Sequence, residues 1–225
     1  MAVSPPPPPI SVRYADPTDR YAHGVLGDAI EYGAIEVLKG REVEHRVVLP
    51  ETRVFEDIAP RIARLTVGGG FMVVMVESDL ALGAQLAVYE FYDGEKLRKR
   101  AATPHIGQRN RWLAPAAIAD FDGDGVNDIT YVETPHLAGI LKIVTLRDDD
   151  LMPVAEPQPG FSNHRIGENF ITSGTRDCGN GVELLLPDLG WTILMAARLE
   201  DGAIVSRPLS HPPSREGIEA AQRCA

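Results

Sequence analysis

The chain has 225 residues, of which 44% are apolar and 24% are charged, a composition typical of a globular protein and not of a disordered one. No run approaches the roughly 18 uninterrupted apolar residues of a membrane helix, which excludes a helical membrane protein. With 22 basic and 32 acidic residues the net charge is −10, which argues against nucleic acid or an anionic membrane surface as the main partner.

The chain begins with a proline-rich segment, residues 1–10, whose first nine residues read MAVSPPPPP. A proline run of this kind predicts an extended polyproline spacer. The segment has neither the basic start nor the apolar stretch of a secretory signal. It is compatible with the start of a mature chain from which a signal was removed.

The region from residue 11 to residue 209 contains an internal repeat. A shift that places Ile62-Ala63 on Ile118-Ala119 also places Val76-Glu77 on Val132-Glu133. A shortened copy follows these two and an incomplete one precedes them, which indicates a repeat protein. The four copies cover about residues 21–54, 55–104, 105–160 and 161–209.

Each copy ends in β-forming residues arranged around a turn that contains Gly or Asp, which predicts a β-hairpin. In the two fullest copies a short apolar run precedes the hairpin, at residues 71–76 and 129–132, and such runs suit strands buried on both faces. Ahead of these runs, residues 59–65 and 114–121 predict a further strand. The predicted hairpins span residues 34–49, 84–101, 140–155 and 192–209.

Four short strands in roughly 50 residues are typical of a β-propeller blade. We therefore expect an all-β fold, a small β-propeller of four four-stranded blades, with five blades as the alternative if both chain ends contribute strands. The first copy lacks its leading strand, which residues 11–21 or the segment after Leu209 would supply. Residues 210–225 form a tail, in which residues 214–222 predict a short helix with Ser214 as its N-cap.

The motif with the most definite chemistry is DFDGDGVND, residues 120–128. Its carboxylates alternate with glycines that permit a tight loop, and hard oxygen ligands around one point suit Ca²⁺. An EF-hand is excluded, because Tyr131 stands where its bidentate Glu would be and both flanks resemble strands. The alternative is a polar loop without an ion, in which the close carboxylates would repel one another. The predicted ligands are Asp120, Asp122, Asp124 and Asp128, with the backbone carbonyl of Val126.

The other copies do not preserve this motif. Arg64, Thr66, Gly68 and Met72 replace the four aspartates in the preceding copy, and the last copy shortens the loop to residues 177–181. The sequence therefore predicts one metal site and not four.

Residues 118–129, IADFDGDGVNDI, closely resemble the FG-GAP/VCBS repeat of integrin α-chain propellers and of many bacterial exported proteins. The whole chain also resembles alphaproteobacterial VCBS-repeat proteins that are made with signal peptides. The resemblance implies that Ca²⁺ is bound between the first two strands of a blade by the ligands named above. It also implies a periplasmic or secreted location and a role in adhesion or ligand binding, with a minority of members fused to enzymes.

An acidic residue recurs at the equivalent place in every copy. An acidic ring that binds a cation is one interpretation. The other is a repeated acceptor for backbone amides at the strand end, which repeat equivalence favours. The four residues are Asp28, Glu77, Glu133 and Asp188.

A second candidate site lies in the polar stretch of residues 161–170. Here His164, Arg165 and Glu168 would converge with Glu133 and His136 as an acid/base pair or an anion clamp. Hydrogen bonding within loops is the alternative. The sequence has no catalytic triad, metal-His spacing or nucleophile elbow to support an enzyme.

Three residues have two interpretations each. An exposed Trp112 would stack on a sugar ring, whereas a buried one would pack in the core. Cys178 and Cys224 form either a disulfide that pins the tail, which would imply an oxidising compartment, or two unrelated free thiols.

These patterns predict an exported, calcium-binding β-propeller that acts as a binding module. We expect a monomer with a protein or glycan ligand, no nucleic acid and no membrane insertion. One alternative is an enzyme with a site of His164, Glu168 and Glu133 near the propeller axis. Another is a structural subunit whose rim docks on a larger exported assembly.

Overall fold

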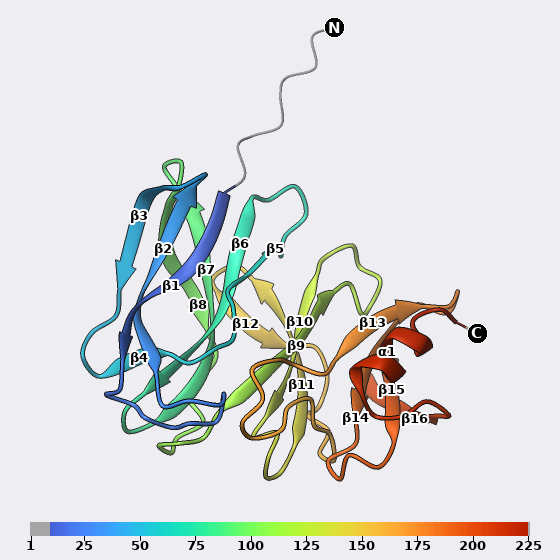
Figure 1. Ribbon diagram of the computed structural model, residues 1–225. Coiled ribbons are helices and arrows are strands. Elements are labelled where there is room, and N and C mark those ends of the chain that lie inside the picture. Colours follow the sequence, from blue (N-terminus) through green and yellow to red (C-terminus); the bar gives the residue numbers. More distant parts are fainter. Residues whose placement is uncertain (1–9, 225) are drawn as a thin grey trace, which may run out of the picture.

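The computed structural model describes residues 10–224 (Figure 1). Sixteen strands in three antiparallel sheets and one short C-terminal helix make up this part of the chain, which confirms the predicted all-β class. The proline-rich segment lies outside the described residues apart from Ile10. The helix, α1 (Arg215–Ala221), is too short to cross a membrane.

The first sheet has eight strands and unites the first two predicted copies. Strands β1, β2 and β3 form one half, and β5 to β8 form the other. Strand β4 pairs with both β2 and β6 and thereby joins the halves. The strands are β1 (Ile10–Thr18), β2 (Glu31–Lys39), β3 (Glu42–Val48), β4 (Arg53–Phe55), β5 (Arg61–Arg64), β6 (Phe71–Asp79), β7 (Gly83–Tyr92) and β8 (Lys96–Ala102).

The other two sheets each have four strands that pair in chain order. The second contains β9 (Leu113–Ala119), β10 (Asp128–Glu133), β11 (Ile140–Arg147) and β12 (Asp150–Pro153). The third contains β13 (Gly174–Asp177), β14 (Val182–Pro187), β15 (Leu194–Glu200) and β16 (Ala203–Leu209), and α1 (Arg215–Ala221) follows it.

All four predicted hairpins are confirmed, as β2–β3, β7–β8, β11–β12 and β15–β16. Gly40, Gly94 and Gly202 lie in their turns at positive φ, which glycine adopts without a steric penalty. The missing strand of the first copy is β1, which pairs with β2 from Ile10 to Thr18. The segment after Leu209 forms α1 and adds no strand.

The central strands are buried on both faces. In β6, Val73 and Met75 point into the hydrophobic cluster shared with β2 and β4, whereas Val74 and Val76 point into the cluster shared with β9 and β10. Because side chains alternate along a strand, a strand between two neighbours must be apolar at every position. This explains the continuous apolar run that β6 shows in the sequence.

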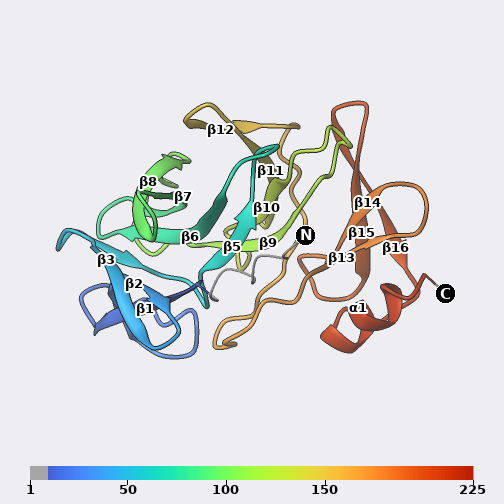
Figure 2. The ribbon, with the colours of Figure 1, turned by 90° about the horizontal axis from the view of Figure 1, so that it is seen from above.

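The strand groups follow one another in an arc (Figure 2). A third cluster, which includes Val132 and Leu184, joins the second sheet to the third. The other face of the third sheet packs against α1, through Leu194 and Ile218 among others. Within residues 10–224 no hydrophobic cluster combines a strand of the first group with a strand of the last, although the loop residues Val25 and Ile171 belong to one cluster. The predicted closure into a propeller therefore remains a prediction.

The outer face of the first strand group carries charges. Glu36 lies between Ile35 and Val37 on β2 and therefore points away from the hydrophobic cluster that those two residues enter. Its carboxylate accepts hydrogen bonds from Arg13 on β1 and Arg46 on β3. These ion pairs make the surface polar at the start of the arc.

Helix α1 closes the opposite end of the arc. Its N-cap is Ser214, as predicted, and the Ser214 hydroxyl accepts a hydrogen bond from the Gly217 amide. Gly217 is required, because a Cβ atom there would lie 1.9 Å from the carbonyl oxygen of Pro212. Gly174 on β13 similarly lets Ile218 approach the sheet, since a Cβ at Gly174 would lie 2.8 Å from that side chain.

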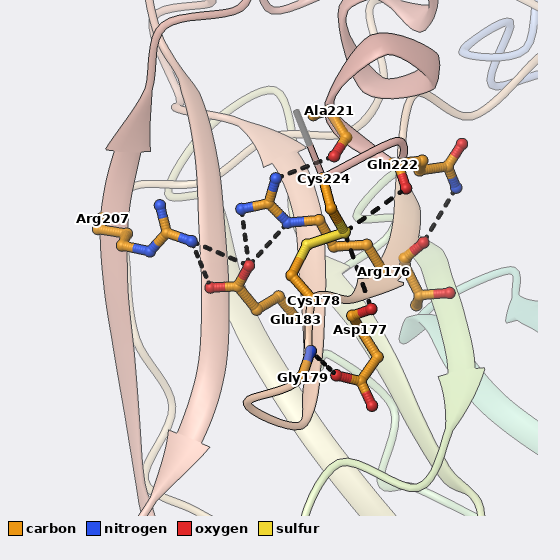
Figure 3. Close-up of a disulfide and its surroundings, with 10 residues drawn as sticks. Arg176, Asp177, Cys178, Gly179, Glu183, Arg207, Ala221, Gln222 and Cys224 are labelled. Atoms are coloured by element: carbon orange, nitrogen blue, oxygen red, sulfur yellow. Dashed lines mark hydrogen bonds and ion pairs between the residues drawn. A yellow bond between two sulfur atoms is a disulfide. The ribbon is translucent and has the colours of Figure 1, made fainter.

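The C-terminal tail is fixed to the third sheet covalently. A disulfide joins Cys178, in the turn after β13, to Cys224, beyond α1 (Figure 3). Beside it, Arg176 binds the Glu183 carboxylate and donates to the carbonyl of Ala221. The helix is therefore held to β13 by a disulfide, polar contacts and apolar packing together.

Cys224→Ser should lower the free energy of unfolding by about 2–4 kcal/mol, because the disulfide closes a long loop in the unfolded chain. Urea unfolding followed by circular dichroism measures the change. A reducing agent should destabilise the unaltered protein to the same extent and leave the variant unchanged. Equal stability of the oxidised protein and the variant would contradict this role.

Candidate functional site

The aspartate-rich loop, residues 120–127, connects β9 to β10. The two strands pair directly, and the last ladder position joins Ala119 to Asp128, so both ends of the loop are held in place. Gly123 and Gly125 have φ values of 79° and 87°, which lets the chain curl back on itself within a few residues.

The loop gathers three carboxylates. Asp120, Asp122 and Asp124 each place an oxygen atom within 4.8 Å of the others, and this group could hold a metal ion. Backbone amides orient all three, since Asp120 accepts from the amides of Gly123 and Gly125 at 2.7 and 2.9 Å. Asp122 and Asp124 each accept from the amide two residues further on. Carboxylates held in this way fit a hard divalent cation.

The two other predicted ligands lie beside this group. Asp128 is 1% exposed and accepts a hydrogen bond from the Phe121 amide. Burial raises the pKa of Asp128 to about 6, and the carboxylates of Asp122 and Asp124 contribute to the rise. Val126 donates its amide to Asp124, and the role of its carbonyl stays a prediction.

No other group of three metal-ligating side chains meets at one point within residues 10–224. In the corresponding loop between β5 and β6, the Arg64 side chain donates to the carbonyl of Gly69. Arg64 also contacts the aspartate-rich loop, because its own carbonyl accepts from the Asn127 side chain at 2.8 Å. The loop is thereby attached to the first sheet.

The second candidate site is assembled in part. His136 Nε2 lies 2.9 Å from His164 Nδ1, and His164 Nε2 lies 2.8 Å from the carbonyl oxygen of Glu168. A carbonyl only accepts, so His164 carries its proton on Nε2 and its Nδ1 accepts from His136. Glu168 therefore contributes its backbone; its carboxylate Oε2 is buried and has no hydrogen-bond partner within residues 10–224.

The remaining members of that predicted cluster contact other side chains. Glu133, at the end of β10, pairs with Lys142 at 2.6 Å. The guanidinium of Arg165 lies over the ring of Trp191, 4.0 Å from its centroid. Glu133 and Arg165 therefore contact Lys142 and Trp191, and their convergence with His164 stays a prediction.

Trp112 is 2% exposed, which agrees with the packing interpretation and leaves no ring face for a sugar. Its indole nitrogen donates to the Glu56 carbonyl at 2.8 Å. The ring stacks on His136 and meets the edge of His164, with centroids 6.1 and 4.9 Å apart. Trp112 is therefore the packing partner of the two imidazoles.

A further pair near Trp112 was not predicted. His23 Nδ1 lies 2.5 Å from the carboxylate of Glu56, which is fully buried and also accepts from the Ser78 hydroxyl. His23 and His136 line the same pocket of about 230 Å³, the histidine pocket. No sequence motif marks His23 and Glu56 as partners, because they are far apart in the chain and meet only when the first sheet folds.

Burial controls the charge of these groups. It lowers the pKa of His136 to about 4, to which the neighbouring His164 and His23 contribute. Burial also lowers the pKa of His164 and raises that of Glu56, the latter against the opposing effect of His23. His136 and His164 are therefore neutral at neutral pH.

The four repeated acids do not share one role. Asp188 accepts from the amides of Thr192 and Ile193, and Asp28 accepts from the Ile30 amide, as the amide-acceptor interpretation predicts. Glu77 and Glu133 instead bind Lys99 and Lys142 respectively. Each acid thus has a local partner.

Comparison with known proteins does not assign the chain to a family. No protein-family model matches the chain, and no curated protein matches it. The geometry of the aspartate loop and of the histidine pocket is therefore the basis for any functional conclusion.

Glu31→Gln should stabilise the protein at alkaline pH. Burial raises the pKa of Glu31 from 4.5 to about 9, and Glu56 and Asp28 add to the rise. Between these values the folded state binds the extra proton, so the free energy of unfolding falls as pH rises, by up to about 1.4 kcal/mol per pH unit. Removing the ionisable group should raise the melting temperature more at pH 8 than at pH 5.

Thermal unfolding at the two pH values measures this effect. Glu51→Gln is the matched control, because the Glu51 side chain is 93% exposed. A Glu31→Gln variant whose melting temperature depends on pH as steeply as that of the unaltered protein would contradict the prediction.

Proposed function

We propose that the protein is an exported, calcium-binding β-repeat protein that acts as a protein-binding module. The observation that carries this proposal is the group formed by Asp120, Asp122 and Asp124. Three carboxylates in an exposed loop repel one another unless a cation neutralises them, so the loop is suited to hold one.

Calcium fits this donor set better than magnesium. Ca²⁺ takes six to eight oxygen ligands in flexible geometry, whereas Mg²⁺ requires a near-ideal octahedron and retains several waters. The carboxylate of Asp128 and the carbonyl of Val126 would complete the shell around half-buried Asp120 and the exposed Asp122 and Asp124. The resemblance of residues 118–129 to calcium-binding repeats supports the same ion.

The ion would have a structural role. The loop connects β9 to β10 and also binds the carbonyl of Arg64 through Asn127. A bound cation would fix the loop and, through this contact, the junction between the first and second sheets.

We further propose that the four strand groups are blades of a propeller-like arc. Hydrophobic clusters between successive groups support this interpretation. So does a hydrogen bond from the Gly167 amide to the carbonyl of Val25, which links the loop before the last group to the loop after β1. A Cβ at Gly27 would lie 2.9 Å from the Gly167 carbonyl, so the two loops are in close contact.

One observation supports export, and another supports a protein partner. The disulfide between Cys178 and Cys224 suits an oxidising compartment. Exposed leucines lie in the turn between the second and third strands of three successive groups, and in a propeller-like arc these turns would share one rim. They are Leu82, Leu137 and Leu189. Apolar side chains repeated in this way would suit a protein partner better than a glycan.

Calcium should raise the melting temperature of protein that has been treated with EDTA. At about 100 times its dissociation constant the ion adds about 2.7 kcal/mol, which corresponds to roughly 5–10 °C for a chain of this size. Asp124→Ala should abolish the shift. Differential scanning calorimetry with Ca²⁺ and, separately, Mg²⁺ measures both effects.

Asp150→Ala is the matched control, since Asp150 is an exposed aspartate of the same sheet outside the loop. It should retain the full calcium response. A calcium shift that persists in Asp124→Ala, or an equal response to Mg²⁺, would contradict the proposed site.

A further inference from the structure

The histidine pocket lies at the opposite end of β10 from the aspartate loop. The loop precedes Asp128, the first residue of β10, whereas His136 follows Glu133, its last residue. The donors in the pocket are imidazole nitrogens and those in the loop are carboxylate oxygens. The two sites therefore differ in place and in chemistry.

His136 is held in a defined orientation. The chain of hydrogen bonds runs from His136 Nε2 to His164 Nδ1 and from His164 Nε2 to the carbonyl of Glu168. His164 is fully buried and packs against Trp112, which also stacks on His136. Since Nε2 of His136 donates, its Nδ1 carries an unshared electron pair.

His23 is oriented by a carboxylate. Its Nδ1 lies 2.5 Å from the Glu56 carboxylate and donates to it when Glu56 is ionised, and the Ser78 hydroxyl donates to the second oxygen of the same carboxylate. The Nε2 atom of His23 is thereby left as the available acceptor. Donation of one ring nitrogen to a carboxylate or a carbonyl is the arrangement that orients metal-binding histidines in proteins.

Both imidazoles line one pocket of about 230 Å³. Thr134 and Asn110 add polar groups to its wall, and the exposed side chains of Leu137 and Ile166 form part of its border. The His23 side chain is 16% exposed, so the pocket is reached from solvent.

We propose that this pocket binds a divalent transition-metal ion of the zinc class through His23 Nε2 and His136 Nδ1. Water or a side chain of a bound protein would occupy the remaining coordination positions. Imidazole is a preferred ligand of Zn²⁺, Cu²⁺ and Ni²⁺, whereas Ca²⁺ selects oxygen. The site does not depend on the proposed calcium function.

The test is a titration of Co²⁺ and then Zn²⁺ into chelator-treated full-length protein that has been saturated with Ca²⁺. We expect one equivalent of Co²⁺ to produce visible d–d absorption, which Zn²⁺ abolishes. His23→Ala and His136→Ala should each weaken binding by more than about 100-fold, and Glu56→Gln by about 10–100-fold with the stoichiometry retained. Asp124→Ala should bind Co²⁺ unchanged, which separates this site from the calcium loop.

His105→Gln is the matched control, because the Nδ1 of His105 lies 2.7 Å from the Gly83 carbonyl and its Nε2 is buried. Nitrogen-15 spectra of the unaltered protein identify the ligating atoms even where a variant fails to fold. Zinc should shift the resonances of His23 Nε2 and His136 Nδ1 directly. Absence of Co²⁺ absorption, unshifted resonances of these atoms, or an equal loss of affinity in His105→Gln would overturn the proposal.

Discussion

The fold depends on the burial of its central strands on both faces. A sheet that is apolar on both sides must be covered on both sides, so each group of strands requires a neighbour. Within the arc each strand group is covered by its neighbours. The two ends of the arc have no such neighbour and are covered in different ways. At the start, the ion pairs around Glu36 make the outer face of β2 polar. At the end, α1 covers the apolar face that β14 and β15 would otherwise expose.

Packing between the sheets fixes the strands, so the loops at the two ends of the strands can differ from one group to the next. The aspartate loop needs only backbone amides and two glycines to gather its carboxylates, so it forms within one short segment. The histidine pocket needs residues from the first sheet, the second sheet and the loop before the third. Its geometry therefore depends on how the strand groups pack, which makes it sensitive to changes far from the pocket itself.

Local patterns made the hairpins, β1, the C-terminal helix and the aspartate group predictable from the sequence. Turn chemistry, apolar runs and closely spaced ligands are properties of short segments. Pairings between distant segments were not predictable in the same way. His23 meets Glu56 only through the packing around β4. The pairing of Glu133 with Lys142 also depends on the register between β10 and β11, which the sequence does not reveal. The burial of Trp112 likewise follows from packing between sheets.

Helix α1 occupies the face of the third sheet on which a further strand group would have to pack. In repeat arrays a terminal cap has an outer face that no further unit can extend, and the length of the array is set where the cap occurs. The third sheet ends in such a cap, and the bond from Cys224 to Cys178 makes it permanent under oxidising conditions. Under reducing conditions the same face would be held by α1 through polar and apolar contacts alone.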